Sequence, residues 1–226
     1  MALQHRYIPL FLGYMFLISI PLAAANEDTI GVRATLLTIE DNAEHMVDTA
    51  LAQDVASSQV LFKSIQKNMD QLHQSMTKAP FNERKSRELL MSYSWLRVIA
   101  VDVKQHAWIG AAIAANQLSA SMIRFINYPT LRQRDTAWMD YLTRELILLN
   151  MESTSENTQL LKVRLSDMLE TWKRIRKSLI EKSFRNKTLV IQVDTMIHTL
   201  ETSKGSDTII TAKQLLNFVG KIEHAK

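Results

Sequence analysis

Cysteine is absent from the 226-residue chain, and glycine and proline are scarce, with five and four residues. Without cysteine no disulfide can form, so the fold must be stabilised by its core, for which a hydrophobic content of 46% is ample. A chain with so few turn-forming residues cannot make the many tight turns of an all-β or α/β fold. The composition therefore favours long helices joined by few loops.

Catalytic and cofactor motifs are absent as well. The sequence contains no G-x-S-x-G, no glycine-rich phosphate loop, no H-E-x-x-H and no C-x-x-C-H haem attachment motif. These absences argue against most common enzyme classes. We therefore expect a protein that is not an enzyme and carries no cofactor.

The N-terminus has the pattern of a secretory signal peptide. Residues 1–7 carry Arg6 and the free amino group, residues 8–22 are uncharged and apolar, and three alanines at 23–25 provide a cleavage position. The apolar run is shorter than the roughly 20 residues that cross a bilayer. We predict that residues 1–25 are removed on export and that residues 26–226 form a single periplasmic domain with no transmembrane span. Without Arg6 the chain has 26 basic and 23 acidic side chains, and this net charge of +3 is too mild to indicate nucleic-acid binding.

Apolar residues recur at helical spacing along four stretches. Between Leu51 and Met76 they follow a 4-3-4-3-4-3-4 spacing, which is the a/d pattern of packed helices. A change of phase at Val47–Leu51 is interpreted as a stutter inside one helix. We predict helices over residues 31–78, 82–127, 133–182 and 187–223, the third open to a break at Ser153–Thr158 and the fourth interrupted at Gly205. These spans predict an all-α, elongated up-down-up-down antiparallel bundle of about four long helices.

Four of the six histidines follow an aspartate by three or four residues, a spacing that can ligate a metal. The E-x-x-H pairs of di-iron bundles are missing, however, and a surface pair lacks the converging ligands that a metal needs. Ordinary surface helix pairs are therefore favoured, and no metal is predicted. The pairs are Asp41/His45, Asp70/His73, Asp102/His106 and Asp194/His198.

The uncharged part of the second predicted helix contains polar side chains that must be at least half buried. Asn116 and Gln117 lie within it, and Arg124 follows it. Because buried amides need hydrogen-bond partners, two interpretations are open. The amides either fix the register of the bundle, which we favour, or bind a ligand.

Basic residues are concentrated late in the third predicted helix. Nine lie between Lys162 and Lys187, and only three acidic residues oppose them. Antiparallel hairpins would bring this segment to the same end of the bundle as the basic residues near the first connection, forming a basic pole. Such a pole could bind an envelope protein or an anionic envelope surface, although a solvated charged surface is the commoner outcome. The predicted pole consists of Lys78, Arg84, Lys85, Arg174, Arg176, Lys177, Lys182, Arg185 and Lys187.

The leading functional hypothesis is a non-enzymatic periplasmic helical-bundle protein that acts as an interaction or scaffold component of the cell envelope. The alternative is a periplasmic ligand- or metal-binding bundle of the sensor type, which would use Asn116, Gln117 and Arg124. An enzyme ranks third. Because a fold alone does not determine function, the sequence leaves the partner, the ligand and the oligomeric state open.

Overall fold

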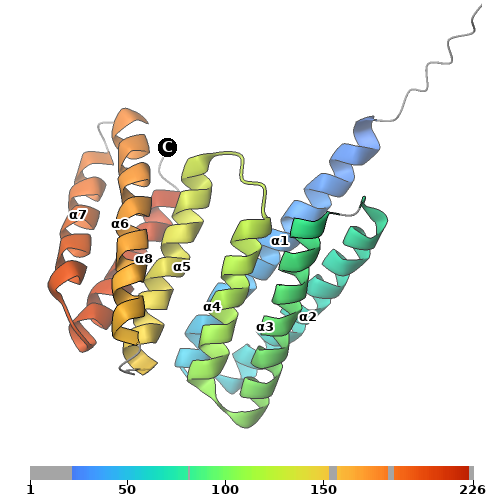
Figure 1. Cartoon of the computed structure of the whole chain (residues 1–226), viewed down its shortest axis with the longest axis horizontal. Coiled ribbons are helices and arrows are strands. Elements are labelled where there is room, and N and C mark those ends of the chain that lie inside the picture. The colour runs from blue at the N-terminus through green and yellow to red at the C-terminus, as the bar shows by residue number, and fades with distance from the viewer. Residues whose placement is uncertain (1–21, 81, 153–156, 183–185, 224–226) are drawn as a thin grey trace, which may run out of the picture.

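A computed structural model of the chain describes residues 22–80, 82–152, 157–182 and 186–223, which form eight α-helices and no strand (Figure 1). The all-α class is confirmed, whereas the prediction of about four long helices is wrong in detail. Most of the predicted signal peptide lies outside the described residues, and its removal stays a prediction. The helices are α1 (Leu22–Leu51), α2 (Val55–Lys78), α3 (Glu83–Gln105), α4 (Trp108–Phe125), α5 (Leu131–Glu152), α6 (Asn157–Lys182), α7 (Lys187–Thr202) and α8 (Ser206–Glu223).

Each predicted long helix is a pair of shorter helices that fold back on one another. α1 packs against α2, α3 against α4, α5 against α6, and α7 against α8. The boundaries between these pairs fall where the sequence predicted the boundaries between rods. Because every predicted rod is folded in two, the molecule is compact rather than elongated.

Two of the chain reversals use a left-handed residue that is not glycine. Gln53 has a φ of 56° and His106 a φ of 60°. After His106, the N–H of Ala107 donates to the carbonyl oxygen of Asp102 at 2.8 Å, and the turn at Gln53 closes in the same way. This is the Schellman closure, which usually has glycine at the left-handed position. With no glycine or proline to mark these turns, the spacing of apolar residues predicted one rod where there are two helices.

The two interruptions foreseen in the sequence coincide with chain reversals. Gly205 is left-handed, with a φ of 56°, and separates α7 from α8. α5 ends at Glu152 and α6 begins at Asn157, so the third rod does break within Ser153–Thr158. Residues 153–156 of that segment lie outside the described residues.

The eight helices form two four-helix bundles, α1–α4 and α5–α8. α4 and α5 lie side by side and join the bundles at the centre of the molecule (Figure 1). One hydrophobic core contains Ile39, Ile65 and Leu118, and the other contains Trp172 and Leu215. Side chains of both bundles therefore meet along the α4–α5 junction.

The central helix α4 is largely buried, as its uncharged sequence predicted. It contacts α1, α3 and α5, and small residues such as Ala111, Ala115 and Ala120 allow these helices to approach closely. Throughout the described part of the chain, no helix is both long enough and apolar enough to cross a membrane.

Candidate functional site

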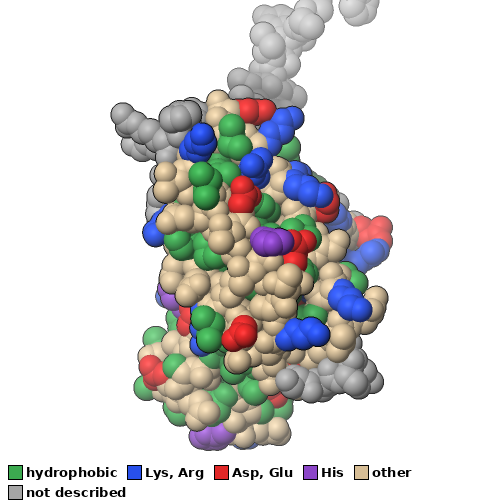
Figure 2. All heavy atoms as spheres, turned by 90° about the vertical axis from the view of Figure 1, so that its left-hand side faces the viewer, with side chains coloured by type: hydrophobic (Ala, Val, Ile, Leu, Met, Phe, Trp, Pro, Cys, Tyr) green, Lys and Arg blue, Asp and Glu red, His purple; other side chains and the backbone are tan. Residues whose placement is uncertain are grey.

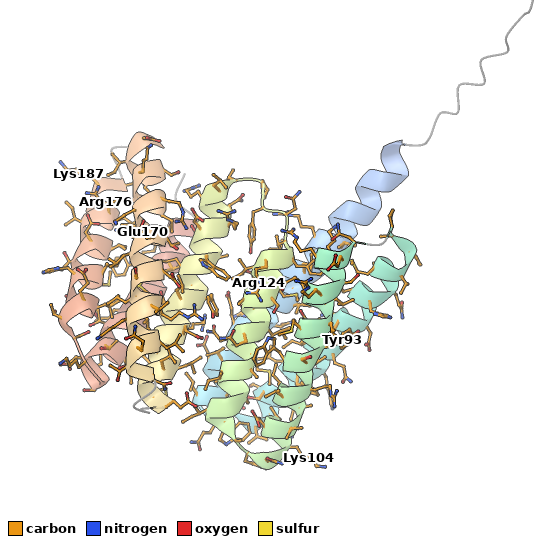
Figure 3. All side chains as sticks on the ribbon, viewed as in Figure 1. Tyr93, Lys104, Arg124, Glu170, Arg176 and Lys187 are labelled. Atoms are coloured by element: carbon orange, nitrogen blue, oxygen red, sulfur yellow. The ribbon has the colours of Figure 1, made fainter. Side chains whose placement is uncertain are left out.

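Residues of the predicted basic pole do not gather at one end of the molecule. Lys78 and Lys85 are exposed near the α2–α3 connection, whereas Lys177 and Lys187 are exposed on α6 and α7. These places belong to different bundles, at opposite ends of the longest axis (Figure 1, Figure 3). On the α6–α7 end, basic side chains are interspersed with acidic and apolar ones (Figure 2). The side chain of Lys182 and the whole of Arg185 lie outside the described residues.

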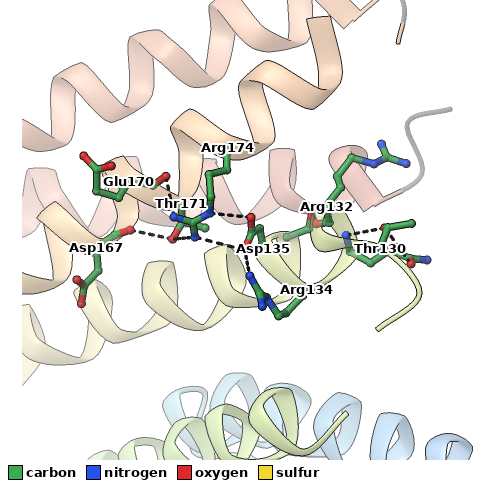
Figure 4. A network of polar contacts seen from close by, with 10 residues as sticks. Thr130, Arg132, Arg134, Asp135, Asp167, Glu170, Thr171 and Arg174 are labelled. Carbon is green, nitrogen blue, oxygen red and sulfur yellow. Dashed lines mark hydrogen bonds and ion pairs between the residues drawn. The ribbon is translucent and has the colours of Figure 1, made fainter. Parts of the chain in front are cut away.

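Arg174 and Arg176 join neighbouring helices of the second bundle. Arg174 Nε lies 2.8 Å from Asp135 Oδ2 on α5, and the Asp135 side chain is only 4% exposed (Figure 4). Arg176 Nε lies 3.0 Å from Asp194 Oδ2 on α7, and Asp194 also accepts a hydrogen bond from Trp172 Nε1 at 2.7 Å. Both arginines are therefore half-exposed and engaged in ion pairs between helices of the same chain.

The two amides singled out in the sequence, Asn116 and Gln117, face Glu145 across the α4–α5 interface. Asn116 Nδ2 donates to Glu145 Oε2 at 2.9 Å, and Gln117 Nε2 donates to Tyr141 Oη at 3.2 Å and to both Glu145 oxygens at 3.2 and 3.1 Å. Burial raises the pKa of Glu145, while the amide hydrogen bonds and the charge of Arg164 oppose that rise. These contacts connect the two bundles, as the register-fixing interpretation expects, and they pair the nitrogen of each amide, whereas the buried Oδ1 of Asn116 has no hydrogen-bond partner among the described residues.

Arg84 and Arg124, which the sequence analysis placed in different groups, line one cavity of about 520 Å³. Figure 3 shows Arg124 on α4, near the middle of the molecule. The cavity is bounded by α3, α4, the α4–α5 connection and the start of α5, so both bundles contribute to it. We call it the arginine cleft, and its lining residues are Arg84, Glu88, Ile123, Arg124, Ile126, Asn127, Tyr128, Thr130, Leu131 and Arg134.

Positive charge exceeds negative charge in the arginine cleft. Arg124 Nε lies 3.1 Å from Glu88 Oε2, and Arg134 Nη2 lies 3.3 Å from Asp135 Oδ1. Arg84 is exposed and makes no ion pair with any described residue. With three guanidinium groups against one carboxylate in its lining, the cleft is suited to an anionic group.

A second cavity, of about 360 Å³, lies between the bundles and is bounded by α1, the α4–α5 connection, α5 and the end of α8. We call it the junction cavity. The lining residues are Arg33, Leu37, Glu40, Asp41, Glu44, Tyr128, Arg132, Gln133, Thr136, Ala137, Ile222 and Glu223.

Glu40 is buried in the wall of the junction cavity, with 7% of its surface exposed. Tyr128 Oη donates a hydrogen bond to Glu40 Oε1 at 2.9 Å. Burial raises the pKa of Glu40 to about 7; the Tyr128 hydrogen bond opposes the rise, and the negative charges of Glu223, Asp140 and Asp41 add to it. Carboxyl groups perturbed in this way cluster at functional sites.

Glu44, one turn further along α1, is in a similar environment. Burial and then the charge of Asp140 raise the pKa of Glu44 well above its ordinary value, and Arg144 opposes that rise. Arg144 already pairs with two other carboxylates, because its Nε lies 2.7 Å from Asp140 Oδ1 and its Nη1 lies 2.7 Å from Asp48 Oδ1. No cation among the described residues is therefore dedicated to Glu44.

Glu40, Tyr128 and Arg134 were not among the predicted site residues. Glu40 directly follows Ile39, which belongs to the buried stripe of α1 together with Ala43 and Met46, so the spacing of apolar residues placed Glu40 beside that stripe and did not single it out. Tyr128 and Arg134 carried no signal either, because their place in a site depends on how α4 and α5 pack.

Of the Asp/His pairs, Asp41/His45 is a surface contact, and the backbone N–H of His106 caps α3 by donating to the carbonyl oxygen of Asp102. Asp41 Oδ1 and His45 Nδ1 lie 3.5 Å apart, and both side chains are exposed. His198 pairs with Glu201 at 3.3 Å rather than with Asp194. In the part of the chain that the structure describes, no group of three or more histidine, cysteine, aspartate or glutamate side chains could hold a metal ion.

Comparisons with known proteins give no relative from which a function could be carried over. No family model matches the chain, and no curated protein and no solved structure matches it either. Function is therefore inferred from the residues of the arginine cleft and the junction cavity.

Proposed function

We propose that the chain is a non-enzymatic periplasmic helical-bundle protein that acts as an interaction component of the cell envelope. We further propose that it binds the phosphate-bearing headgroup of an anionic envelope lipid in the arginine cleft. The observation that supports this function is the convergence of Arg84, Arg124 and Arg134, from both bundles, on one cavity. A guanidinium group binds phosphate through two parallel hydrogen bonds, and three such groups can surround one phosphate.

The edge of the cleft also suits a lipid. Leu131, the first residue of α5, is 70% exposed and lines the cleft together with Ile123 and Ile126. Apolar side chains beside basic ones are typical of proteins that lie at a membrane interface. In this arrangement the arginines hold the headgroup, and Leu131 contacts the start of the acyl chains.

Vesicle flotation with the mature chain, residues 26–226, tests this function. The protein should float with vesicles that contain phosphatidylglycerol and should stay behind with vesicles of phosphatidylcholine alone. The association should weaken as sodium chloride rises from about 0.05 M to about 0.5 M, because added salt screens exposed charges. A protein with no preference for the anionic vesicles would contradict lipid binding.

Arg84→Glu and Lys85→Glu form a matched pair for locating the interaction. Both residues are exposed and the two variants make the same charge change, but only Arg84 lines the cleft. Arg84→Glu should weaken vesicle binding about tenfold or more, and Lys85→Glu should have a much smaller effect. An equal loss in both variants would mean that general positive charge attracts the vesicles. Crosslinking from position 84 in the native envelope that captured a protein and no lipid would assign the cleft to a protein partner.

A further inference from the structure

The junction cavity is separate from the arginine cleft, although Tyr128 lines both. Its volume of about 360 Å³ lies within the range of about 300–1,000 Å³ that small-molecule sites occupy. The cleft has one carboxyl group in its lining, whereas the junction cavity combines four carboxyl groups with two guanidinium groups and an apolar wall formed by Leu37, Ala137 and Ile222. This mixture points to a ligand that carries both signs of charge.

Glu40 makes no ion pair with any described residue, although it lies in a cavity lined by several charged groups. Glu40 faces Asp41 of its own helix, Asp140 of α5 and Glu223 of α8, and each of these adds negative charge. The hydroxyl group of Tyr128 supplies a hydrogen bond to Glu40 but no charge. An ammonium group in the cavity would compensate this concentration of negative charge.

Glu44 strengthens this argument because it lies one turn from Glu40 and lines the same cavity. Among the described residues, the one hydrogen bond donated to Glu44 comes from Ser119 Oγ and is long, at 3.4 Å. The nearby guanidinium group of Arg144 is already paired with Asp140 and Asp48. Glu40 and Glu44 can therefore hold one ammonium group between them.

Arg33, which lies on α1 nearer its N-terminus than Glu40, has a hydrogen-bond donor without an acceptor among the described residues. Nε of Arg33 is buried and makes no hydrogen bond. Buried donors without partners are rare in proteins, and a carboxylate is the acceptor that a guanidinium group pairs with best. Arg33 as a whole is only half-buried and lies in the lining of the junction cavity, so its guanidinium group can pair with a carboxylate of a ligand there.

The order of these residues along α1 sets the shape of the ligand. Arg33, Leu37, Glu40 and Glu44 follow one another at intervals of three or four residues, so they share one face of the helix. Arg33 and Glu40 are seven residues apart, or about 10 Å along the helix axis, and Leu37 lies between them. A positive, an apolar and a negative segment thus succeed one another across the cavity.

We infer that the junction cavity binds a small zwitterion with an aliphatic spacer. Its carboxylate pairs with Arg33, its spacer lies on Leu37, and its ammonium group is held by Glu40 and Glu44. A divalent metal is a poorer occupant, because no described group of three carboxylate or histidine ligands could hold one and the cavity also contains Arg33 and Arg132. The site uses none of the three arginines of the cleft, so it can be tested independently of lipid binding.

Calorimetric titration of the mature chain with three matched probes tests this inference. The probe ε-aminohexanoate carries both charged groups, hexanoate lacks the ammonium group, and hexylamine lacks the carboxylate. We expect ε-aminohexanoate to bind, and each of the other two to bind about tenfold more weakly or worse. No binding of ε-aminohexanoate at about 10 mM, or equal binding of either partial probe, would overturn the proposal.

Two variants place the probe in the cavity. Glu40→Gln should weaken the binding of ε-aminohexanoate about tenfold without lowering the melting temperature, because glutamine keeps the size of the side chain and an acceptor for Tyr128. The control Glu170→Gln removes an exposed carboxylate on α6 and should leave binding unchanged (Figure 3). In Arg33→Gln, ε-aminohexanoate and hexylamine should bind equally. Wild-type affinity in Glu40→Gln would refute the assignment.

Discussion

Replacing Glu40 with glutamine tests whether the burial of this carboxyl group lowers the stability of the folded protein. Glu40 is 7% exposed, and burial raises the pKa of Glu40 from 4.5 to about 7. The folded state therefore holds this proton more tightly than the unfolded chain does. Below about pH 4.5 the group is protonated in both states, so it adds no pH dependence. Between about pH 4.5 and about pH 7 the unfolded chain loses the proton first, and the free energy of unfolding falls as the pH rises.

The full effect is reached above about pH 7 and amounts to about 3 kcal/mol, because each pKa unit corresponds to about 1.4 kcal/mol. Glutamine is close to glutamate in size, carries no charge, and offers an amide oxygen to the hydroxyl group of Tyr128, which donates to Glu40 at 2.9 Å. The substitution should therefore remove the loss of stability and change little else. In a chain of this length, about 3 kcal/mol corresponds to a rise in melting temperature of roughly 6–12 °C.

Thermal unfolding followed by circular dichroism, at about pH 4.5 and about pH 8, measures the effect. Glu40→Gln and the wild type should melt at similar temperatures at the lower pH, and the variant should melt higher at the upper pH. Glu170→Gln, which changes an exposed carboxylate, should have the melting temperature of the wild type at both pH values. If Glu40→Gln and the wild type melted at the same temperature at about pH 8, the pKa of Glu40 would not be raised in the folded state, and the reasoning would be refuted.

Three further substitutions test contacts of the fold. A Cβ at Gly110 would lie 2.5 Å from Asp102 Oδ2, so the Asp102 carboxylate must move aside in Gly110→Ala. The stabilisation of about 1 kcal/mol expected from helix propensity should therefore be larger in an Asp102→Ala background than in the wild type, and urea unfolding of the four combinations measures this coupling. His106→Gly should raise the urea midpoint by the equivalent of about 1 kcal/mol, because His106 has a φ of 60° that glycine adopts without strain, and a lower midpoint would contradict this. Arg174→Ala should lower the free energy of unfolding by about 1–3 kcal/mol, since Asp135 is 4% exposed and would keep only its second ion pair; an unchanged melting temperature would show that this contact contributes nothing.

The all-α class could be predicted from the sequence, but the number of helices could not. Scarce glycine and proline together with a 4-3 spacing of apolar residues point to helices in any arrangement. The reversals at Gln53 and His106 leave no such mark, because a polar residue adopts the left-handed conformation in each Schellman closure. The two helices of each hairpin also bury their apolar residues in the same core, so the 4-3 spacing of apolar residues continues across the turn. Gly205 was found because it is the residue that such a turn usually selects.

Candidate residues for the arginine cleft could be named from the sequence, but the cleft itself could not. Arg84 was selected for the charge around it, and Arg124 for its place after an uncharged helical segment. What brings them together with Arg134 is the packing of α5 on α4, which joins the two bundles. No local pattern encodes that contact. The same packing separates Arg84 from Lys177 and Lys187, so the charge of a segment was a poor guide to which basic residues share a surface.

Glu40 was missed for a reason that also bears on its role. A helix that belongs to one bundle needs one buried stripe, and α1 has that stripe in Ile39, Ala43 and Met46. Glu40 lies beside it, on the face that meets α5 and α8 of the other bundle across the junction cavity. Docking of the two bundles therefore buries the carboxyl group and forms the cavity at the same time. If Glu40→Gln gains stability and keeps its affinity for ε-aminohexanoate, the buried charge serves no binding function. If it gains stability and loses affinity, binding is the reason that a destabilising residue is kept at this position.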